Sequence, residues 1–475
     1  MKAIFVNKEE NVQYIDSHSR SKEWKNLIEN SEVIIGENRI KLPSSPLTSS
    51  PTYHPYLHAI RTKPFLLLAG ISGTGKSRIV RELAFKSCPA YLQDKDGTTP
   101  GNYCMIEVKP NWHDSTELLG YYSNLREKYL FTKFVKFLVK AKMYPDVPFF
   151  VCLDEMNLAP VEQYFAEMLS VLETRKTVGG TIKTGAVIGA EHFKALEILD
   201  NTTPQLSQTL SDRDIYFKLH EINNKEDVRE VGAHIDKTVA DRHDLTTEGL
   251  TLPDNVVIIG TVNMDDTTHQ FSRKVIDRAM TIEMNGGRLK EMFGGSRRLS
   301  YTADEAEQQK WQHAFRQRYV SADEVLDAHA DKADALKDLL PKKLEDINAA
   351  LKGTPFEVSY RVLNELAIMV GVMADDAPEE NLETIADRAL DRILLMKVLP
   401  RIEGDSDMFN LKTPRDVNGV TCRNRLEWLR ELAPAIKTNE EEGEKEPTGH
   451  RQTAREKIEE MIERLENQEF TRFWP

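Results

Sequence analysis

Cysteine is scarce in this sequence, which contains four cysteines in 475 residues: Cys88, Cys104, Cys152 and Cys422. So few thiols in so long a chain do not make a disulfide framework, and none of them are paired at the spacing of zinc ligands. The sequence therefore indicates a reduced, cytoplasmic protein. The apolar start, Ala3–Val6, is too short for a secretory signal.

Long apolar runs are lacking as well. The stretch from Phe149 to Leu153 ends at Asp154 and is far too short to cross a bilayer, so we expect no membrane association. Positive charge is also in deficit, because 63 lysines and arginines face 76 acidic residues and the net charge is -13. A chain this acidic does not hold nucleic acid by bulk electrostatics. Contact with DNA would need a local basic patch or a partner subunit.

Four short apolar runs are the main signal of the fold. They predict strands at 65–68, 105–108, 149–153 and 256–262. Runs that are apolar throughout suit a parallel sheet that is covered on both faces. Because helical patterns lie between these runs, the sequence predicts a doubly wound α/β core.

Shifts in composition divide the chain into further units. In order, these are a small N-terminal element (1–42), a linker rich in Pro, Ser and Thr (43–55), the α/β core (56–299), a helical lid domain (300–437), an acidic linker (438–452) and a C-terminal helix with an aromatic tip (453–475). The core contains a polar insertion at 175–252, which opens on a hairpin. Since the acidic linker precedes the last helix, we expect that helix to be separate from the core.

A complete phosphate-binding motif follows the first predicted strand. It fits G-x-x-x-x-G-K-[ST] and consists of Gly70, Ile71, Ser72, Gly73, Thr74, Gly75, Lys76 and Ser77. An apolar strand before it and a helical pattern after it are the context that this motif requires. Its glycines let the backbone N–H groups point at phosphate oxygens. Lys76 would neutralise the β and γ phosphates, and the Ser77 hydroxyl would bind Mg²⁺.

Two adjacent acids, Asp154 and Glu155, end the third predicted strand. In a P-loop protein this is the place of the metal-side acid and of the acid that activates water. We therefore expect Asp154 to bind Mg²⁺ and Glu155 to polarise the attacking water. The alternative is a solvated strand end followed by a helix cap at Asn157.

Asn263 and Arg278 follow the fourth predicted strand. An amide at Asn263 can orient the attacking water, although asparagine is also common in turns. Arg278 can reach the nucleotide of a neighbouring subunit as a finger. An ion pair with Asp277 or Glu283 is an equally good interpretation of Arg278.

Together these residues, over about 56–405, resemble the McrB family of AAA+ motors, which power modification-dependent restriction of foreign DNA. The resemblance lies in Ala69–Ser77, Leu118–Tyr122, Leu153–Ala159, Gly260–Asp266, Phe271–Arg278, Tyr360–Glu365 and Leu399–Ile402. It implies an AAA+ P-loop core followed by an α-helical lid. It also implies a hexameric ring, Mg²⁺ as cofactor, GTP or ATP as substrate, and a separate McrC-like nuclease subunit, with DNA contacted through the complex.

The resemblance also assigns individual residues. Asn263 and Asp266 fall on the signature loop of the family, Arg278 on its finger, and Arg361 on the nucleotide-binding arginine of the lid. The signature often reads Asn-Thr-Ala-Asp-Arg, whereas this chain has Asn-Met-Asp-Asp-Thr at 263–267. A MoxR-like ATPase that remodels or loads proteins without DNA would share every catalytic residue, and it is the alternative function.

Two further patterns bear on function. The pair Tyr121 and Tyr122 could line a central pore and grip a polymer, but core packing is the commoner fate of such a pair. The sequence shows no carboxylate cluster of a nuclease, so we expect DNA cleavage to belong to another chain.

Overall fold

The computed structural model describes residues 3–6, 12–15, 32–35, 38–41, 53–94, 96–196, 210–264, 272–284, 299–436 and 452–474. The chain divides into two compact units, Met1–Ser49 and Ser50–Pro475. The first unit contains an antiparallel sheet of four strands in the order β2-β1-β3-β4: β1 Ala3–Val6, β2 Val12–Ile15, β3 Glu32–Ile35 and β4 Asn38–Lys41. The apolar residues at 3–6 and 33–35 predict strands in this element, and the structure confirms both. The sequence also predicts a helical turn at 24–28, which lies outside the described residues.

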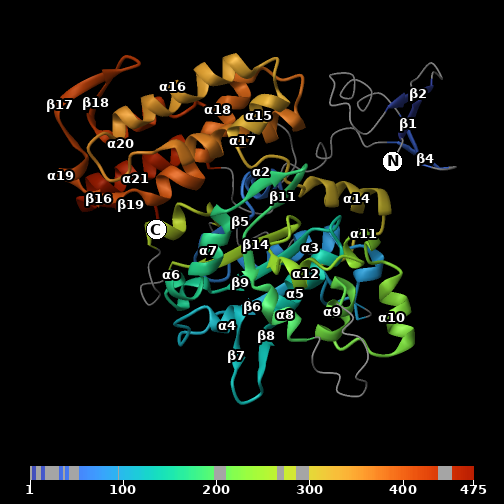
Figure 1. The fold of residues 1–475 in the computed structure, drawn as a ribbon. Coiled ribbons are helices and arrows are strands. Elements are labelled where there is room, and N and C mark those ends of the chain that lie inside the picture. The colour runs from blue at the N-terminus through green and yellow to red at the C-terminus, as the bar shows by residue number, and fades with distance from the viewer. Residues whose placement is uncertain are drawn as a thin grey trace. The chain divides into compact units, whose positions relative to one another are not determined.

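The second unit is built around a parallel sheet of five strands in the order β15-β5-β14-β9-β6 (Figure 1). Its strands are β5 Phe65–Gly70, β6 Tyr103–Glu107, β9 Phe149–Asp154, β14 Val256–Asn263 and β15 Met280–Glu283. The four predicted strands are confirmed, and β15 is an additional one. This parallel sheet, with the phosphate-binding motif after β5 and the mainly helical region that follows, confirms the predicted fold class of an α/β core followed by a helical lid.

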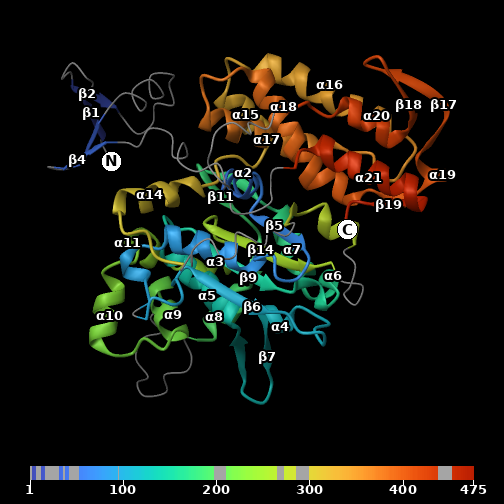
Figure 2. The same cartoon turned by 180° about the vertical axis from the view of Figure 1, so that it is seen from behind.

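Helices cover both faces of the sheet, as the uniformly apolar strands predict. Helix α3 (Lys76–Ser87) lies across β5, β14 and β9 and is in front of the sheet in Figure 2. On the other face, Phe65 of β5 contacts the ring of Phe165, between α6 (Val161–Tyr164) and α7 (Ala166–Glu173). All six residues of β5 are buried, so the strand that precedes the phosphate-binding motif is held firmly in the core.

A hairpin extends from the core between α4 (Thr116–Leu119) and α5 (Lys133–Met143). Its strands are β7 (Gly120–Ser123) and β8 (Lys128–Phe131), and both views show it projecting from the sheet (Figures 1 and 2). Tyr121 and Tyr122 are 51% and 50% exposed. The expectation that this pair packs in the core is therefore wrong, because the hairpin carries both rings away from it.

The segment predicted as an insertion opens on a hairpin, as expected, with β10 (Lys176–Val178) paired to β11 (Thr181–Lys183). Strand β12 (Ala186–Ile188) pairs with β13 (Leu250–Thr251), which brings the two ends of the segment together. Between them, the described residues form five short helices, α8 Ala190–Lys194, α9 Asp212–Leu219, α10 Lys225–Gly232, α11 Lys237–Ala240 and α12 Asp244–Thr247. Because β12 and β13 pair, the two ends of the segment lie together, and β14 can follow while it still pairs with β5 and β9.

Helices dominate the region after residue 300, as the sequence predicts. They are α14 Glu305–Ala314, α15 Ala322–Ala328, α16 Ala333–Leu351, α17 Tyr360–Asp376, α18 Leu382–Ile393, α19 Ser406–Phe409 and α20 Arg425–Leu432, with turns η5 Leu394–Val398 and η6 Leu399–Arg401 after α18. The region is not entirely helical, because β17 (Asn410–Val417) pairs with β18 (Val420–Asn424). Asn418 and Gly419 form its turn with φ of 51° and 82°, which is the conformation that an Asn-Gly hairpin favours.

The C-terminal helix α21 (Ala454–Gln468) is not separate from the rest of the fold, contrary to expectation. It packs against α20 and α18, and β19 (Phe470–Arg472) after it pairs with β16 (Glu403–Asp405). Phe473 is 1% exposed, and Lys457 forms an ion pair of 2.6 Å with Glu283 of β15. Apolar residues on one face of α21 find their partners in the lid, so the acidic linker does not isolate this helix.

Across the part of the chain that the structure describes, no helix has the length and apolarity that a membrane span requires.

Candidate nucleotide site

The phosphate loop connects the carboxyl end of β5 to α3. Gly73 and Gly75 both have a φ of 84°, in the left-handed region that glycine enters without steric cost. Gly75 is also the N-cap of α3. A side chain at either position would be strained, so the glycines of the motif are required by the backbone. The loop ends on the amino terminus of a helix, where unpaired N–H groups and the helix dipole favour an anion.

Lys76, the first residue of α3, is buried and turns back into this loop. Its ammonium group donates hydrogen bonds to the carbonyl oxygens of Gly70 and Ile71, both at 2.8 Å. The Thr74 hydroxyl donates to the same Ile71 oxygen at 3.0 Å. The loop thus holds a fixed positive charge in contact with its own backbone, as an anion-binding loop requires.

Asp154, the last residue of β9, faces the start of α3. The Ser77 hydroxyl donates to Asp154 Oδ1, and the Thr261 hydroxyl donates to the same atom at 2.8 Å. The strand register explains this contact, because Gly260 pairs with Leu153 and the residues that follow them lie side by side. Ser77 and Asp154, predicted to share one metal ion, are therefore brought into direct contact.

Glu155 has a left-handed backbone, with φ 51° and ψ 49°, which few residues other than glycine adopt. Its amide donates to the Thr261 hydroxyl at 2.9 Å, and the Asn263 amide group donates to Glu155 Oε1 at 2.9 Å. The Asn157 side chain is buried and donates to the Asn263 carbonyl oxygen at 2.8 Å. The predicted pair of Glu155 and Asn263 is thus in contact, and the strained turn between β9 and η3 (Met156–Leu158) is held by three hydrogen bonds.

These residues fit a nucleoside triphosphate with Mg²⁺. Ser77 and Asp154 supply adjacent oxygen atoms, and Mg²⁺ in phosphate sites takes one or two protein oxygens with the rest from water and phosphate. The described residues contain no group of three or more His, Cys, Asp or Glu side chains arranged to hold a metal ion. Asp266, predicted on the signature loop, lies outside the described residues.

Arg278 and Arg361 meet on a single carboxylate. Arg278 Nε lies 3.3 Å from Glu173 Oε1, and Arg361 Nη2 donates to Glu173 Oε2 at 2.8 Å. The ion-pair interpretation of Arg278 named Asp277 or Glu283, and neither is its partner in the described contacts. Glu173 ends α7, whereas Arg361 is in the first turn of α17, so a core helix and a lid helix are joined here.

This arginine pair lies at the amino end of the parallel strands, whereas the phosphate loop lies at their carboxyl end. Arg278 comes two residues before Met280, which pairs with Leu66 near the start of β5, while the phosphate loop follows Gly70 at its end. At about 3.3 Å per residue, the Arg278 backbone is about 20 Å from the start of the loop in its own chain. Since Arg361 shares Glu173 with Arg278, the lid arginine also lies near the amino end of the strands.

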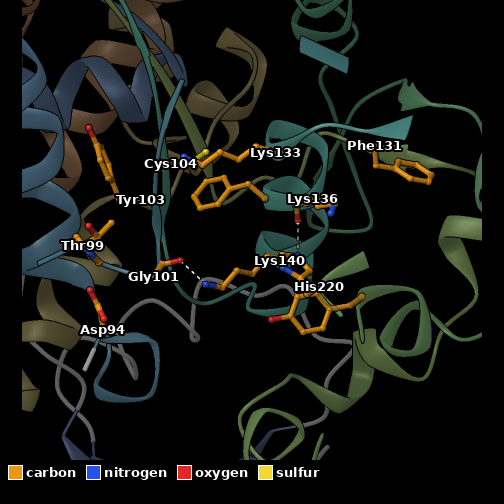
Figure 3. A pocket seen from close by; sticks show the side chains of 13 residues that line it. Asp94, Thr99, Gly101, Tyr103, Cys104, Phe131, Lys133, Lys136, Lys140 and His220 are labelled. Atoms are coloured by element: carbon orange, nitrogen blue, oxygen red, sulfur yellow. Dashed lines mark hydrogen bonds between the residues drawn. The ribbon is translucent and has the colours of Figure 1, made fainter. Parts of the chain in front are cut away.

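A separate pocket of about 610 Å³ lies beside β6, the edge strand, and is lined by none of the predicted site residues (Figure 3). Lys140 and Lys133 of α5 donate to the carbonyl oxygens of Gly101 and Met105 there, at 2.7 and 3.1 Å. Burial lowers the pKa of His220 on its wall to about 4, so that ring is neutral. The lysines are held by the strand edge, and the chemistry of this chain is centred on the phosphate loop instead.

Sequence patterns did not identify two residues of the site. Thr261 connects the two acids, and its signal was a lone polar residue within the apolar run of β14. Glu173 joins Arg278 to Arg361 from a position 188 residues away from the latter. No local pattern contains that information.

Comparisons with known proteins give little beyond this geometry. Residues 312–470 match the model of a domain of unknown function, DUF8727. Comparison with curated proteins gives no match. The chain is similar to a crystal structure of a "putative ATPase" from Cytophaga hutchinsonii ATCC 33406, with 16% identity, 71% of this chain and 79% of that chain covered, and a TM-score of 0.30. Any assignment of function therefore rests on the site itself.

Proposed function

We propose that this chain is a Mg²⁺-dependent nucleoside triphosphatase of the AAA+ type. The supporting observation is that five residues meet at the carboxyl end of the parallel strands: Lys76, Ser77, Asp154, Glu155 and Asn263. These are a phosphate-binding cation, a hydroxyl and a carboxylate suited to Mg²⁺, and a carboxylate with an amide suited to a water molecule. No other arrangement among the described residues combines these groups.

Each residue has a distinct task in this hydrolysis. Lys76 and the loop amides bind the phosphates and compensate their charge. Ser77 and Asp154 would hold Mg²⁺, which supplies charge neutralisation on the phosphate oxygens when bound. Glu155, oriented by Asn263 and by its strained backbone, accepts a proton from the attacking water. Thr261 connects the two acids, because its hydroxyl is bonded to the Asp154 carboxylate and to the Glu155 amide.

The remote arginines support a ring in which each site is completed by a neighbour. The Arg278 backbone is about 20 Å from its own phosphate loop, and Arg361 shares Glu173 with Arg278. We therefore expect neither arginine to complete the site of its own chain. An arginine delivered from another subunit stabilises charge on the transferred phosphoryl group and is worth about 10³–10⁵ in rate. We propose a homo-oligomer, hexameric as the family resemblance implies. In this ring the surface that carries Arg278 and Arg361 on one subunit faces the phosphate loop of the next. Arg278 would be the finger, with Arg361 beside it.

The family resemblance supports a more specific role. In this proposal the ring is the motor of a McrBC-like restriction complex and drives a separate McrC-like nuclease subunit, through which the complex acts on DNA. The nucleotide is GTP or ATP. Turnover of both, measured side by side with and without an McrC-like partner, tests this role. Stimulation by that partner supports it, and full activity that the partner never changes would contradict it.

Subunit mixing tests the shared site. Lys76→Ala removes the phosphate-loop charge but keeps Arg278, and Arg278→Ala keeps the phosphate loop. Each variant alone should be nearly inactive, and Arg278→Ala should still bind nucleotide while hydrolysing it at least about 100-fold more slowly. In mixed rings, the loop of one variant meets the arginine of the other, so activity should return on mixing.

The matched control is Arg388→Ala, which removes an arginine from a partly exposed lid ion pair with Glu380. It should hydrolyse nucleotide at the parental rate and leave the mixing result unchanged. If Lys76→Ala and Arg278→Ala co-assemble and the mixture stays inactive, Arg278 does not act on a neighbouring site.

A further inference from the structure

The turn that carries Arg278 is held by one buried lysine of the lid. Lys397 has a side chain that is 2% exposed and lies in the π-helical turn η5. Its ammonium group donates to the carbonyl oxygens of Asp277 and Ala279 at 2.7 and 2.9 Å. These are the residues on either side of Arg278. The Ile276 carbonyl oxygen lies slightly farther away, at 3.4 Å.

Lys397 has a counter-ion on the helix that carries the other arginine. Glu365 Oε2 lies 3.1 Å from Lys397 Nζ, and the Glu365 side chain is 4% exposed. Glu365 is on α17, one helical turn after Arg361, so the two residues lie on the same face of this helix and move together with it. The same turn has a second contact with the lid, because Arg401 Nε lies 3.1 Å from Asp277 Oδ1.

Two lysines share the carboxylate of Glu365. Lys63, just after α2 (His54–Thr62), forms an ion pair of 2.8 Å with the other oxygen of Glu365. Burial lowers the pKa of Lys397 to about 8 while Glu365 acts to raise it, so the ammonium form prevails at neutral pH. Burial alone would raise the pKa of Glu365, but Lys397 and Lys63 hold it below its usual value. Both members of the pair are therefore ionised.

Stability alone does not account for this arrangement. A buried ion pair is often no more stabilising than apolar residues of the same volume, because desolvation offsets the attraction between the charges. Here the Lys397 ammonium group donates hydrogen bonds to the backbone carbonyl oxygens on both sides of Arg278. π-Helical turns inside helices also occur frequently at functional positions.

We propose that Lys397, with Glu365 as counter-ion, is a positioning residue that fixes Arg278 for delivery to the neighbouring site and sets it in register with Arg361. This inference rests on the proposed function, because it requires Arg278 to act on a neighbour. Removing Lys397 should leave the phosphate loop intact and misplace the arginine. A misplacement of about 1 Å can lower the rate about 100-fold.

The test compares Lys397→Met with Lys63→Met. Both remove a cation from Glu365, but only Lys397 contacts the backbone beside Arg278. Lys397→Met should lower kcat at least about 10-fold while the affinity for a fluorescent GTP or ATP analogue changes less than about threefold. Lys63→Met should change kcat much less. Because Lys397→Met leaves Glu365 with a single partner, the double variant Lys397→Met/Glu365→Gln is measured as well, and it should show the same loss of kcat with a restored melting temperature.

Subunit mixing then separates positioning from general damage. Mixed with Lys76→Ala, Lys397→Met should regain activity, since the Lys76→Ala subunits supply an intact arginine turn. Mixed with Arg278→Ala, it should stay inactive, since both lesions lie on the same side of the interface. If the reference mixture of Lys76→Ala and Arg278→Ala stays inactive, the proposed function fails. If that mixture is active but Lys397→Met variants hydrolyse at the parental rate, lose nucleotide affinity in step with kcat, or regain activity with Arg278→Ala, this inference alone is overturned.

Discussion

Glu155 keeps its left-handed backbone because its amide donates a hydrogen bond of 2.9 Å to the hydroxyl of Thr261. The same hydroxyl donates to the neighbouring acid, Asp154. One buried oxygen is therefore bonded to the carboxylate of Asp154 and to the backbone of Glu155. The arrangement has a direct consequence for mutation, because a threonine hydroxyl can be removed with almost no change in shape.

Thr261→Val should slow hydrolysis at least about 10-fold while nucleotide binding stays within a few-fold, because the acids lose their common anchor. Valine suits a strand, but the Glu155 amide would lack an acceptor, which costs about 1–3 kcal/mol of unfolding free energy. Thr261→Ser keeps the hydroxyl and is the control. Equal rates for the valine and serine variants would show that this hydroxyl does not position the acids.

Glu155→Gln should bind nucleotide normally and hydrolyse it about 10²–10⁴-fold more slowly. The amide can still accept the hydrogen bond from Asn263, so shape is kept and basicity is lost. A ring held in its nucleotide-bound state should then elute early in size-exclusion chromatography. Glu162→Gln, on exposed surface of α6, is the control for loss of a carboxylate. Parental turnover by the Glu155→Gln variant would rule out Glu155 as the base.

The aromatic residues of the C-terminus should differ sharply in their effect on stability. Phe473 is 1% exposed, and its ring is 4.7 Å from Lys457 Nζ, whereas Phe470 is 45% exposed. Phe473→Ala should lower the unfolding free energy by about 3–5 kcal/mol, as for other buried phenylalanines. Phe470→Ala should change it by less than about 1 kcal/mol. Urea denaturation of both variants measures this, and similar midpoints would contradict the observed packing.

Stability should depend on pH through Asp391, which accepts a hydrogen bond from the first amide of α21 at 2.8 Å. Burial raises the pKa of Asp391 to about 6 from its ordinary value of 3.8. The folded state thus binds this proton more tightly than the unfolded state, so the carboxyl group is best tolerated at low pH and disfavours folding as pH rises through about 6.

Asp391→Asn keeps the acceptor and cannot ionise. Its unfolding free energy should match that of the parent near pH 4 and exceed it by about 1–3 kcal/mol above pH 7. Denaturation at several pH values measures the difference between the two proteins, which removes the contributions of other acids. A difference that stays constant from pH 4 to pH 8 would show that Asp391 does not titrate in this way.

The sequence predicted those parts of the fold whose signal is local. The strands β5, β9 and β14 are uninterrupted apolar runs, and the phosphate loop is a contiguous motif, so both could be found without knowing the tertiary structure. Strand β15 is short and ends in Glu283, whose carboxylate is buried against Lys457 of α21. Its assignment depends on a partner far along the chain.

The site shows the same division. Asp154, Glu155 and Asn263 follow apolar strands that lie side by side, so their meeting could be predicted from the parallel sheet. The sharing of Glu173 by Arg278 and Arg361 could not, because it depends on how the lid packs on the core. The docking of α21 on the lid was missed for the same reason, since an acidic linker says nothing about where the helix after it packs.

The lysines on the free edge of β6 have a consequence for how copies of this chain can join. Lys133 and Lys140 occupy the outward carbonyl oxygens of Met105 and Gly101, so an incoming strand would have to displace two ammonium groups before it could pair. The sheet is thus terminated by charge, without a proline or a covering strand. In the proposed ring, contacts between subunits would instead be made by side chains at the two ends of the strands, which would leave each nucleotide between two subunits.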